Sequence, residues 1–288
     1  MTLATEREDF IHPVLRDAAV TVVQNPLSIG ERLWNSARLR KTIIILLLAI
    51  IWEGYARWLD NELLFPTLTA TLQALVRAVQ NGELTNRIVA SLSVLLIGYG
   101  LGIVLAFLLA IAAITTRLGS DLLDILTSML NPLPAVALLP LALLWFGLGL
   151  QSIIFVLLHA VVWPVALNAH SGFRAVPDTL RMVGRNYGLT GIAFAVRILL
   201  PAAFPSILAG FKIGWAFAWR TLIAAELVFG VTSGSGGLGW YIFENKNLIQ
   251  IPEVFAGLFT VILIGLAAEN FIFRTVERNT VQRWGMQR

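Results

Sequence analysis

Six long apolar segments restrict what this chain can fold into more than any other feature. Each is long enough to cross a bilayer as one helix, and they cover residues 42–58, 88–114, 122–146, 153–170, 204–229 and 254–273. Of the 288 residues, 57% are hydrophobic and 13% are charged, whereas about 25% of a soluble domain is charged. Because backbone groups find no partners in lipid, spanning segments of this length form helices. The sequence therefore predicts an all-α membrane protein with six transmembrane helices.

Basic residues concentrate in three parts of the chain, and their distribution predicts an orientation. The three parts are residues 7–41, 174–197 and 274–288, whereas the loops on the opposite side mix both signs of charge. Cytoplasmic loops of membrane proteins carry the excess of Lys and Arg. We therefore expect both termini and the loop over residues 173–201 in the cytoplasm. The net charge of +4 is then an orientation signal, because the basic residues are not interleaved with aromatic ones as in nucleic-acid-binding proteins.

The segments and charges divide the chain into three expected parts. These are a cytoplasmic tail over residues 1–41, a transmembrane domain over 42–275 and a second cytoplasmic tail over 276–288. The first tail carries both signs of charge and has no apolar segment near its start, which is unlike a cleavable signal peptide. Its residues 27–41 are interpreted either as an amphipathic helix at the membrane interface or as a partly ordered tail.

The loop over residues 173–201 contains four arginines and one aspartate and has the pattern of a helix, a break and a second helix. Asp178 is placed to cap a helix that begins after Pro177, and Gly188 allows that helix to end sharply. Pro201 then starts the segment that leads into the fifth span. Such an arrangement would project a rigid element for docking to a partner, and the alternative is a solvated loop with one short helix.

The same loop resembles the coupling loop of binding-protein-dependent ABC-importer permeases. That loop reads Glu-Ala-Ala, three residues, Gly, nine residues and then Ile-x-Leu-Pro. In this chain the positions of the coupling loop are occupied by Met182, Val183, Gly184, Arg185, Gly188, Ile198, Leu200 and Pro201, with Asp178 one turn earlier. The Gly-to-Pro spacing matches, whereas the Glu-Ala-Ala residues themselves are absent.

Other segments resemble one branch of this family, the permeases for nitrate, sulfonates, taurine and bicarbonate. They are residues 132–149, rich in proline and glycine, residues 199–210, and residues 225–239. The resemblance covers about residues 60–275. It implies a type I importer bundle of six helices with cytoplasmic coupling helices, located in a bacterial inner membrane. It also implies transport of a small anion such as a sulfonate, taurine, nitrate or bicarbonate.

The resemblance further implies several partners and no chemistry in this chain. The partners would be a second permease subunit, giving a homodimer, two cytoplasmic ABC ATPases, an external solute-binding protein and the lipid bilayer. ATP and Mg would be bound by the ATPases, since this chain has no Gly-x-x-x-x-Gly-Lys-Ser/Thr motif. The alternative function is a secondary transporter, although no repeat with paired broken helices is found. An intramembrane enzyme using His159 or His170 is disfavoured, because the sequence supplies no nucleophile or metal ligands beside them and no cysteine.

Polar residues inside the spans are candidates for a translocation pathway, because ionisable groups at bilayer depth usually face a cavity or a partner. His159, Trp163 and His170 share one helical face, which is either a pathway-facing stripe or a pair of histidines hydrogen-bonded between helices. The fifth span adds Trp219, Arg220 and Glu226. Arg220 either attracts an anionic solute or forms a buried ion pair with Glu53 or Glu269.

Three smaller expectations complete the sequence-based prediction. Apolar residues from Leu68 to Val76 have helical spacing and predict a short helix near the outer surface. Trp240 and Tyr241 are expected at the membrane interface. Two Gly-x-x-x-Gly pairs, at residues 98–102 and 210–214, are expected to pack within the bundle or across a dimer.

Overall fold

The computed structural model describes residues 35–229 and 236–283, and all regular structure in these ranges is helical. The elements in chain order are α2 (Ala37–Leu59), α3 (Leu68–Gln80), α4 (Glu83–Thr115), α5 (Arg117–Leu130), η1 (Ala135–Leu138), α6 (Leu139–Phe146), α7 (Leu150–Arg174), α8 (Asp178–Asn186), α9 (Gly191–Phe194), η2 (Ala195–Leu199), α10 (Leu200–Phe229), α11 (Leu238–Asn247), α12 (Ile251–Ala267), η3 (Ala268–Phe273), α13 (Arg274–Glu277) and η4 (Arg278–Gln282). The prediction of an all-α membrane protein is confirmed.

The chain divides into two compact units, residues 1–51 and residues 52–288. The described part of the first unit is the first portion of α2, an apolar helix that begins at Ala37. The last residues of the predicted tail over 1–41 thus belong to the helix of the first span. Most of the interfacial helix proposed for residues 27–41 lies outside the described residues. At the other end of the chain, helical turns continue to Gln282, well into the segment predicted as a second tail.

Within the described residues, five helical segments are long and apolar enough to cross a membrane. They are Ala37–Leu59, Glu83–Thr115, Leu150–Arg174, Ala195–Phe229 and Ile251–Gln282. The predicted third span is different, because α5 and the η1–α6 segment are bent by 87° relative to each other. They form a sixth crossing only if the bent pair is counted as one span.

The prediction of one continuous third helix over residues 122–146 is therefore wrong. Pro132 and Pro134 stand at the bend, between the end of α5 and the start of η1. A proline lacks the N–H that continues a helix, and it disfavours the helical conformation of the residue before it. Two prolines this close end α5 and leave the chain free to turn before it becomes helical again.

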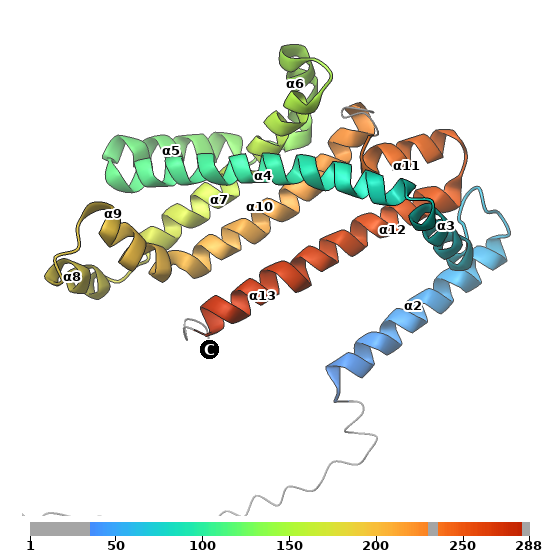
Figure 1. Ribbon diagram of the computed structural model, residues 1–288, viewed down its shortest axis with the longest axis horizontal. Helices are drawn as coiled ribbons and strands as arrows, with labels where there is room; N and C mark the ends of the chain where they lie inside the picture. The colour runs from blue at the N-terminus through green and yellow to red at the C-terminus, as the bar shows by residue number, and fades with distance from the viewer. Residues whose placement is uncertain (1–34, 230–235, 284–288) are drawn as a thin grey trace, which may run out of the picture. The chain divides into compact units, whose positions relative to one another are not determined.

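Helix α7 is the centre of the larger unit and packs along both α4 and α10 (Figure 1). Glycines allow these close approaches. A Cβ atom on Gly98 or Gly102 of α4 would lie 2.7 Å from side-chain atoms of α7, and one on Gly210 or Gly214 of α10 would lie 2.8 or 3.0 Å from them. Both Gly-x-x-x-Gly pairs thus serve packing within the bundle, one of the two alternatives expected for them.

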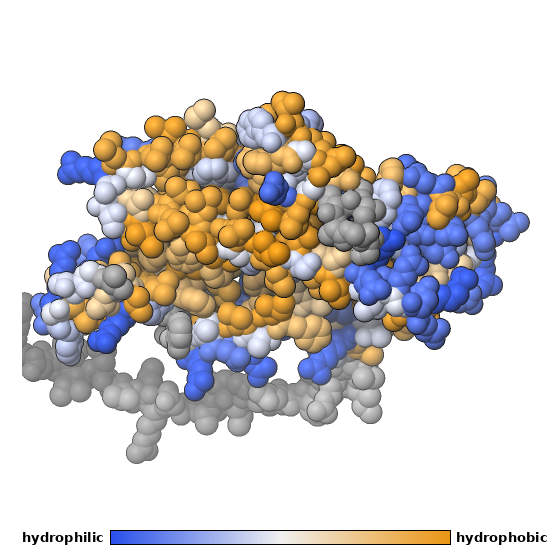
Figure 2. Space-filling view, turned by 45° about the horizontal axis from the view of Figure 1, so that its top comes forward, coloured by the Kyte–Doolittle hydropathy of each residue, from blue (hydrophilic) through white to orange (hydrophobic). Residues whose placement is uncertain are grey.

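The surface of the larger unit has the distribution of polarity that a bilayer requires. Hydrophobic residues cover the middle of the face in Figure 2, whereas hydrophilic residues gather toward the end that carries α3 and α11 and toward the end that carries α8. Long apolar side chains on α4, such as Leu101 and Leu108, are 49% and 60% exposed. Since an aqueous surface rarely exposes such a continuous apolar area, this area is the lipid-facing surface.

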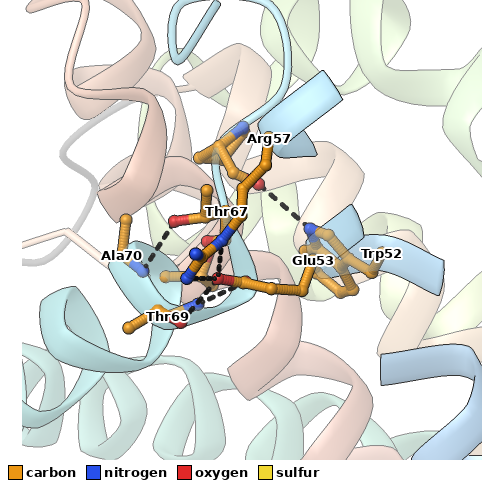
Figure 3. Close-up of polar contacts among 8 residues, drawn as sticks. Trp52, Glu53, Arg57, Thr67, Thr69 and Ala70 are labelled. Atoms are coloured by element: carbon orange, nitrogen blue, oxygen red, sulfur yellow. Dashed lines mark hydrogen bonds and ion pairs between the residues drawn. The ribbon is translucent and has the colours of Figure 1, made fainter. Parts of the chain in front are cut away.

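The end of α2 is fixed to the start of α3 by polar contacts (Figure 3). The Glu53 carboxylate accepts hydrogen bonds from the Thr69 backbone N–H and hydroxyl at 3.1 and 2.8 Å, and from Arg57 at 2.7 Å. The indole N–H of Trp52 donates to the Pro66 carbonyl at 3.0 Å. The short helix expected from residues 68–76 is confirmed as α3.

Candidate functional site

The predicted coupling loop forms the short helix α8, which begins where the sequence indicates but not with the predicted cap. Pro177 is the last extended residue, with φ −58° and ψ 142°, so Asp178 is already the first residue of the helix. The Asp178 side chain makes no capping hydrogen bond, and its carboxylate lies 3.9 Å from the Arg181 Nε atom. A carboxylate in the first turn still stabilises the helix through its interaction with the helix dipole.

The end of α8 is set by Gly188, as predicted. Gly188 has φ +70°, a left-handed conformation that glycine adopts without steric cost. Its N–H donates to the Arg185 carbonyl at 2.9 Å, and the Leu189 N–H donates to the Gly184 carbonyl at 3.0 Å. These two bonds are the pair that terminates a helix with a glycine. The chain then turns sharply and becomes helical again in α9, η2 and α10, where Ile198 and Pro201 lie.

Gly184 is the point at which the two arms of the loop touch. It is buried, and a Cβ atom at this position would lie 2.7 Å from the Phe194 ring and 2.9 Å from Ile198 Cγ1. A small residue is therefore required here, although the Glu-Ala-Ala sequence of the resembling loops is absent. Phe194 was not identified from the sequence, because only the folded loop brings it across to residue 184.

Arg181 joins α8 to the end of α7 and is a second residue that sequence analysis did not assign to the site. Its Nη2 donates to the Phe173 carbonyl at 2.6 Å, and its Nε donates to the Val176 carbonyl at 3.2 Å. Carbonyls at the end of a helix lack intrahelical partners, so the guanidinium satisfies groups that would otherwise need water. The only signal in the sequence was an arginine within one turn of a helix start.

Apolar side chains of α8 remain at the surface. Leu180, Met182, Val183 and Tyr187 are 41%, 55%, 46% and 82% exposed, and Arg185 is exposed beside them. A nine-residue helix that shows three large apolar side chains, with Tyr187 at its C-terminal cap, has the character of a protein–protein contact surface.

A second candidate site is a cavity of about 280 Å³ between α7, α10 and the bend after α5. Three of the predicted pathway residues line it: His159 and Trp163 from α7, and Arg220 from α10. The rest of the wall comprises Asn131, Pro132, Leu133, Pro134, Ala135, Val136, Ala160, Pro164, Phe217 and Thr221. The structure thus brings these predicted residues together around the proline-rich bend.

Arg220 is the charged residue of this cavity, and it has no carboxylate within 4.0 Å among the described residues. Its Nε donates to the Ala216 carbonyl at 3.0 Å, and its guanidinium carbon lies 5.1 Å from the centre of the Phe217 ring. The predicted alternative of an ion pair with Glu53 or Glu269 is wrong. Glu53 binds Arg57, one turn away, and Glu269 lies 4.0 Å from Lys212.

The indole N–H of Trp163 is buried and has no hydrogen-bond partner in the described part of the chain. The imidazole nitrogens of His159 are buried as well, and the ring interacts with the backbone carbonyl of Leu130 at the end of α5. The two rings meet edge to face, with centroids 6.0 Å apart. His170 has no hydrogen bond to a described residue, so the alternative of histidines bonded between helices is not observed for His170, whereas His159 of α7 does interact with the Leu130 carbonyl of α5. His170 lines a different cavity of about 1,090 Å³ near the α8 end, so the expected stripe is divided between two cavities.

Trp219 and Glu226, also predicted for the pathway, lie elsewhere. Trp219 is 6% exposed, and its indole N–H donates to the Val261 carbonyl of α12 at 3.2 Å. Glu226 is 3% exposed and accepts hydrogen bonds from the Ser91 hydroxyl at 2.7 Å and from the Gly239 N–H at 2.8 Å. Neither residue lines the 280 Å³ cavity.

Glu226 instead joins α4, α10 and the start of α11. Helix α11 was not predicted from the sequence, and Tyr241, which was expected at the membrane interface, lies in this helix with 1% of its surface exposed. Its helix follows a glycine-rich turn that packs directly onto the Glu226 carboxylate, so the aromatic side chain is carried into the core. Within residues 35–229 and 236–283, no three His, Asp or Glu side chains are grouped so that they could hold a metal ion.

Comparison with known proteins gives a consistent result. The family model for the binding-protein-dependent transport system inner membrane component matches residues 98–284. A Methanocaldococcus jannaschii protein assigned as an ABC transporter permease is 31% identical over 77% of this chain and 84% of its own length. The nitrate import permease of a Synechocystis species is 28% identical over 86% and 90% of the two chains. The taurine transport system permease of Escherichia coli is 26% identical over 78% and 82%.

Proposed function

This chain belongs to the family of binding-protein-dependent transport system inner membrane components, and on that premise we propose that it is the membrane-spanning subunit of an ABC importer. In this role it forms the path for a small solute and takes energy from ATP hydrolysed by partner ATPases. The observation that carries the proposal is the geometry of α8. This helix is anchored to α7 and to the α9–η2 segment that leads into α10, and it presents exposed apolar side chains at one polar end of the molecule.

The anchoring of α8 is what makes it suited to transmit force. Arg181 ties it to the carbonyl of Phe173 in α7, and Gly184 packs against Phe194 and Ile198 on the segment leading into α10. A partner that moves α8 would therefore move both helices that line the 280 Å³ cavity. A solvated loop, the alternative considered for this segment, would not need such close contacts.

The proposed solute is a small anion. Relatives are described as permeases for nitrate and for taurine, and both solutes carry an oxoanion group. The cavity fits such a solute, because its lining includes Arg220 and no acidic residue. We propose a sulfonate such as taurine, nitrate or bicarbonate as the class of cargo, and His159, Trp163 and Arg220 as pathway residues. Trp219 and Glu226 would stabilise the helices around the path through their contacts with α12 and α4.

The proposed assembly contains two copies of this chain as a homodimer, two cytoplasmic ATPases and an external solute-binding protein. ATP and Mg bind to the ATPases, and closure of the ATPase pair pulls the two α8 helices together and opens the path outward. The binding protein then releases its solute into the path. Both termini lie in the cytoplasm of a bacterial cell, and this chain itself breaks no covalent bond.

The test is copurification of an ABC ATPase from the same genome with wild-type and variant chains. Val183→Glu places a charge on the exposed face of α8, and Val79→Glu makes the same change on α3. The two valines are 46% and 50% exposed, so they are matched in residue type and in exposure. We expect the ATPase to be retained by wild type and by Val79→Glu but lost with Val183→Glu.

Two further variants, Gly188→Pro and Arg185→Glu, test the shape and the charge of the same surface and should also lose the ATPase. Retention of the ATPase by all of these α8 variants would contradict the docking role. If no ATPase copurifies even with wild type, and solute uptake persists without ATP, the alternative of a secondary transporter would replace the proposal.

A further inference from the structure

We propose that the 280 Å³ cavity is a binding site for one small oxoanion, held by the guanidinium of Arg220 and by the indole N–H of Trp163, with the His159 ring in the wall beside them. This inference rests on the proposed function and goes beyond it. It names the site in this chain, the groups that bind and the chemical class that fits. The site lies between α7, α10 and the bend after α5.

Arg220 has N–H donors that no described residue uses. A guanidinium has five N–H donors, and the structure uses one of them, in the Nε bond to the Ala216 carbonyl. The terminal nitrogens, which can hold two oxygens of one oxoanion side by side, have no partner among the described residues. Arg220 lies nine residues before Phe229, about 14 Å from that end of α10. A positive charge at such a depth is costly unless it is compensated.

A neutral donor lies beside this charge. The indole N–H of Trp163 is a donor only, and it is buried without a partner among the described residues. Buried donors without partners cost free energy, so an occupant that accepts hydrogen bonds would stabilise the cavity. The side chains of Asn131 and Thr221 also line it. The lining contains no carboxylate that would repel an anion or compete for Arg220.

The size and the wall of the cavity suit a small solute. A volume of about 280 Å³ is just below the range for pockets that bind drug-sized ligands, which is roughly 300–1,000 Å³. The apolar part of the wall comes from side chains such as Pro132, Val136 and Phe217. The cavity therefore fits nitrate or a sulfonate with a short carbon chain, and it excludes large aromatic sulfonates.

The bend between α5 and η1 supports the same conclusion. Non-helical backbone at membrane depth is tolerated where it lines a cavity or is buried in protein. Residues 131–134, which interrupt the helix, are lining residues of this cavity. A purely structural bend would not need a charged side chain and unpaired donors opposite it.

The test uses the fact that the chain contains no cysteine. Val136→Cys places one thiol in the cavity wall, at a residue that is 40% exposed. The thiol is modified in membrane vesicles with two methanethiosulfonate reagents of similar size, one carrying a sulfonate and the other a quaternary ammonium group. An anion site predicts that the ratio of the sulfonate rate to the ammonium rate is higher at residue 136 than at a control residue outside the cavity. Val76→Cys, on α3 and 52% exposed, is the matched control.

Arg220→Gln should lower the ratio of the sulfonate rate to the ammonium rate by about tenfold at residue 136, since a unit charge is removed at short range. The ratio at residue 76 should not change. Arg220→Lys keeps the charge and should keep most of the ratio. Millimolar nitrate or taurine should slow modification at residue 136, whereas glycerol should not.

The proposal is overturned if Arg220→Gln leaves the ratio at residue 136 unchanged, as it would if a carboxylate of another subunit neutralised this arginine. It is also overturned if neither nitrate nor taurine protects the thiol of an otherwise unaltered chain, a measurement that does not depend on the folding of an Arg220 variant. Both readouts need only this chain in a membrane. Failure of ATPase copurification would therefore reject the proposed function without affecting them.

Discussion

Gly102 on α4 lies so close to α7 that its contact with Val161 leaves no space for a methyl group. A Cβ atom at residue 102 would lie 2.7 Å from Val161 Cβ and 2.8 Å from Val161 Cγ1. Val161 Cβ is attached directly to the backbone, so a change of side-chain rotamer does not relieve the contact. Gly100 provides a matched control on the same helix, because a Cβ atom there would meet nothing within 4 Å.

The expected magnitude follows from the distance. Carbon atoms attract best at about 3.5–4.0 Å, so Gly102→Ala forces α4 and α7 apart by about 1 Å. Overpacking of this kind costs roughly 1–3 kcal/mol. Replacement of glycine by alanine inside a helix also stabilises the helix by about 1 kcal/mol. Because Gly100→Ala gains the same amount, this contribution cancels when the two variants are compared. The free energy of unfolding of Gly102→Ala should therefore be lower than that of Gly100→Ala by about 1–3 kcal/mol.

The assay is the fraction of monodisperse protein left after heating in detergent, measured by size-exclusion chromatography. For a chain of this size, 1 kcal/mol corresponds to roughly 2–4 °C in melting temperature. Gly102→Ala should therefore melt about 2–12 °C below Gly100→Ala. Equal melting temperatures for the two variants would refute the reasoning, because they would mean that α4 does not approach α7 as closely as these distances require.

Three further perturbations test other contacts. Arg181→Gln should increase cleavage of α8 by proteinase K, because it releases this helix from α7, whereas Arg185→Gln should not. Glu226→Ala should lower the melting temperature more than Glu226→Gln, because it leaves the buried Ser91 hydroxyl without its acceptor, at about 1–3 kcal/mol for each unsatisfied group. Burial raises the pKa of Tyr241 from 10.0 to about 12. The stability that the buried, protonated Tyr241 hydroxyl contributes is therefore complete below pH 10.0 and is lost as the pH rises through about 12. Tyr241→Phe should make the melting temperature less sensitive to pH in that range.

The positions of the long helices could be predicted from the sequence, because the apolar run that marks each span is a local property of the chain. A run of about 20 apolar residues identifies a span without knowledge of any partner, and this gave five long helices close to their observed positions. The bend in the third span was not predicted, although Pro132 and Pro134 were noted. Prolines show where a helix is interrupted, but the 87° angle depends on what α6 packs against.

The same distinction between local and distant contacts applies to the candidate sites. Gly188 was assigned correctly because a glycine after a helix acts within its own turn. Glu226 was assigned to the pathway, but Ser91, with which it forms a hydrogen bond, lies 135 residues away in sequence. The prediction for Arg220 failed in the other direction, because it proposed a distant partner for a carboxylate that has a local one. Glu53 forms its ion pair with Arg57, four residues along the same helix. Pairings across the bundle require the packing of the helices, which a single sequence does not reveal.

The two candidate sites lie at separate places along the same two helices, and this arrangement makes the proposed function coherent. Through Arg181, α8 holds the end of α7 at Phe173, and Trp163 lies ten residues earlier on that helix, about 15 Å away. Gly184 contacts Phe194, which leads through η2 into α10 and to Arg220. Because α7 and α10 are also packed together through glycines, a displacement of α8 cannot move one wall of the cavity alone. Energy delivered at the loop is therefore expected to act on the position of Arg220 relative to the donor on α7, which is the change that would alternately hold and release an anion.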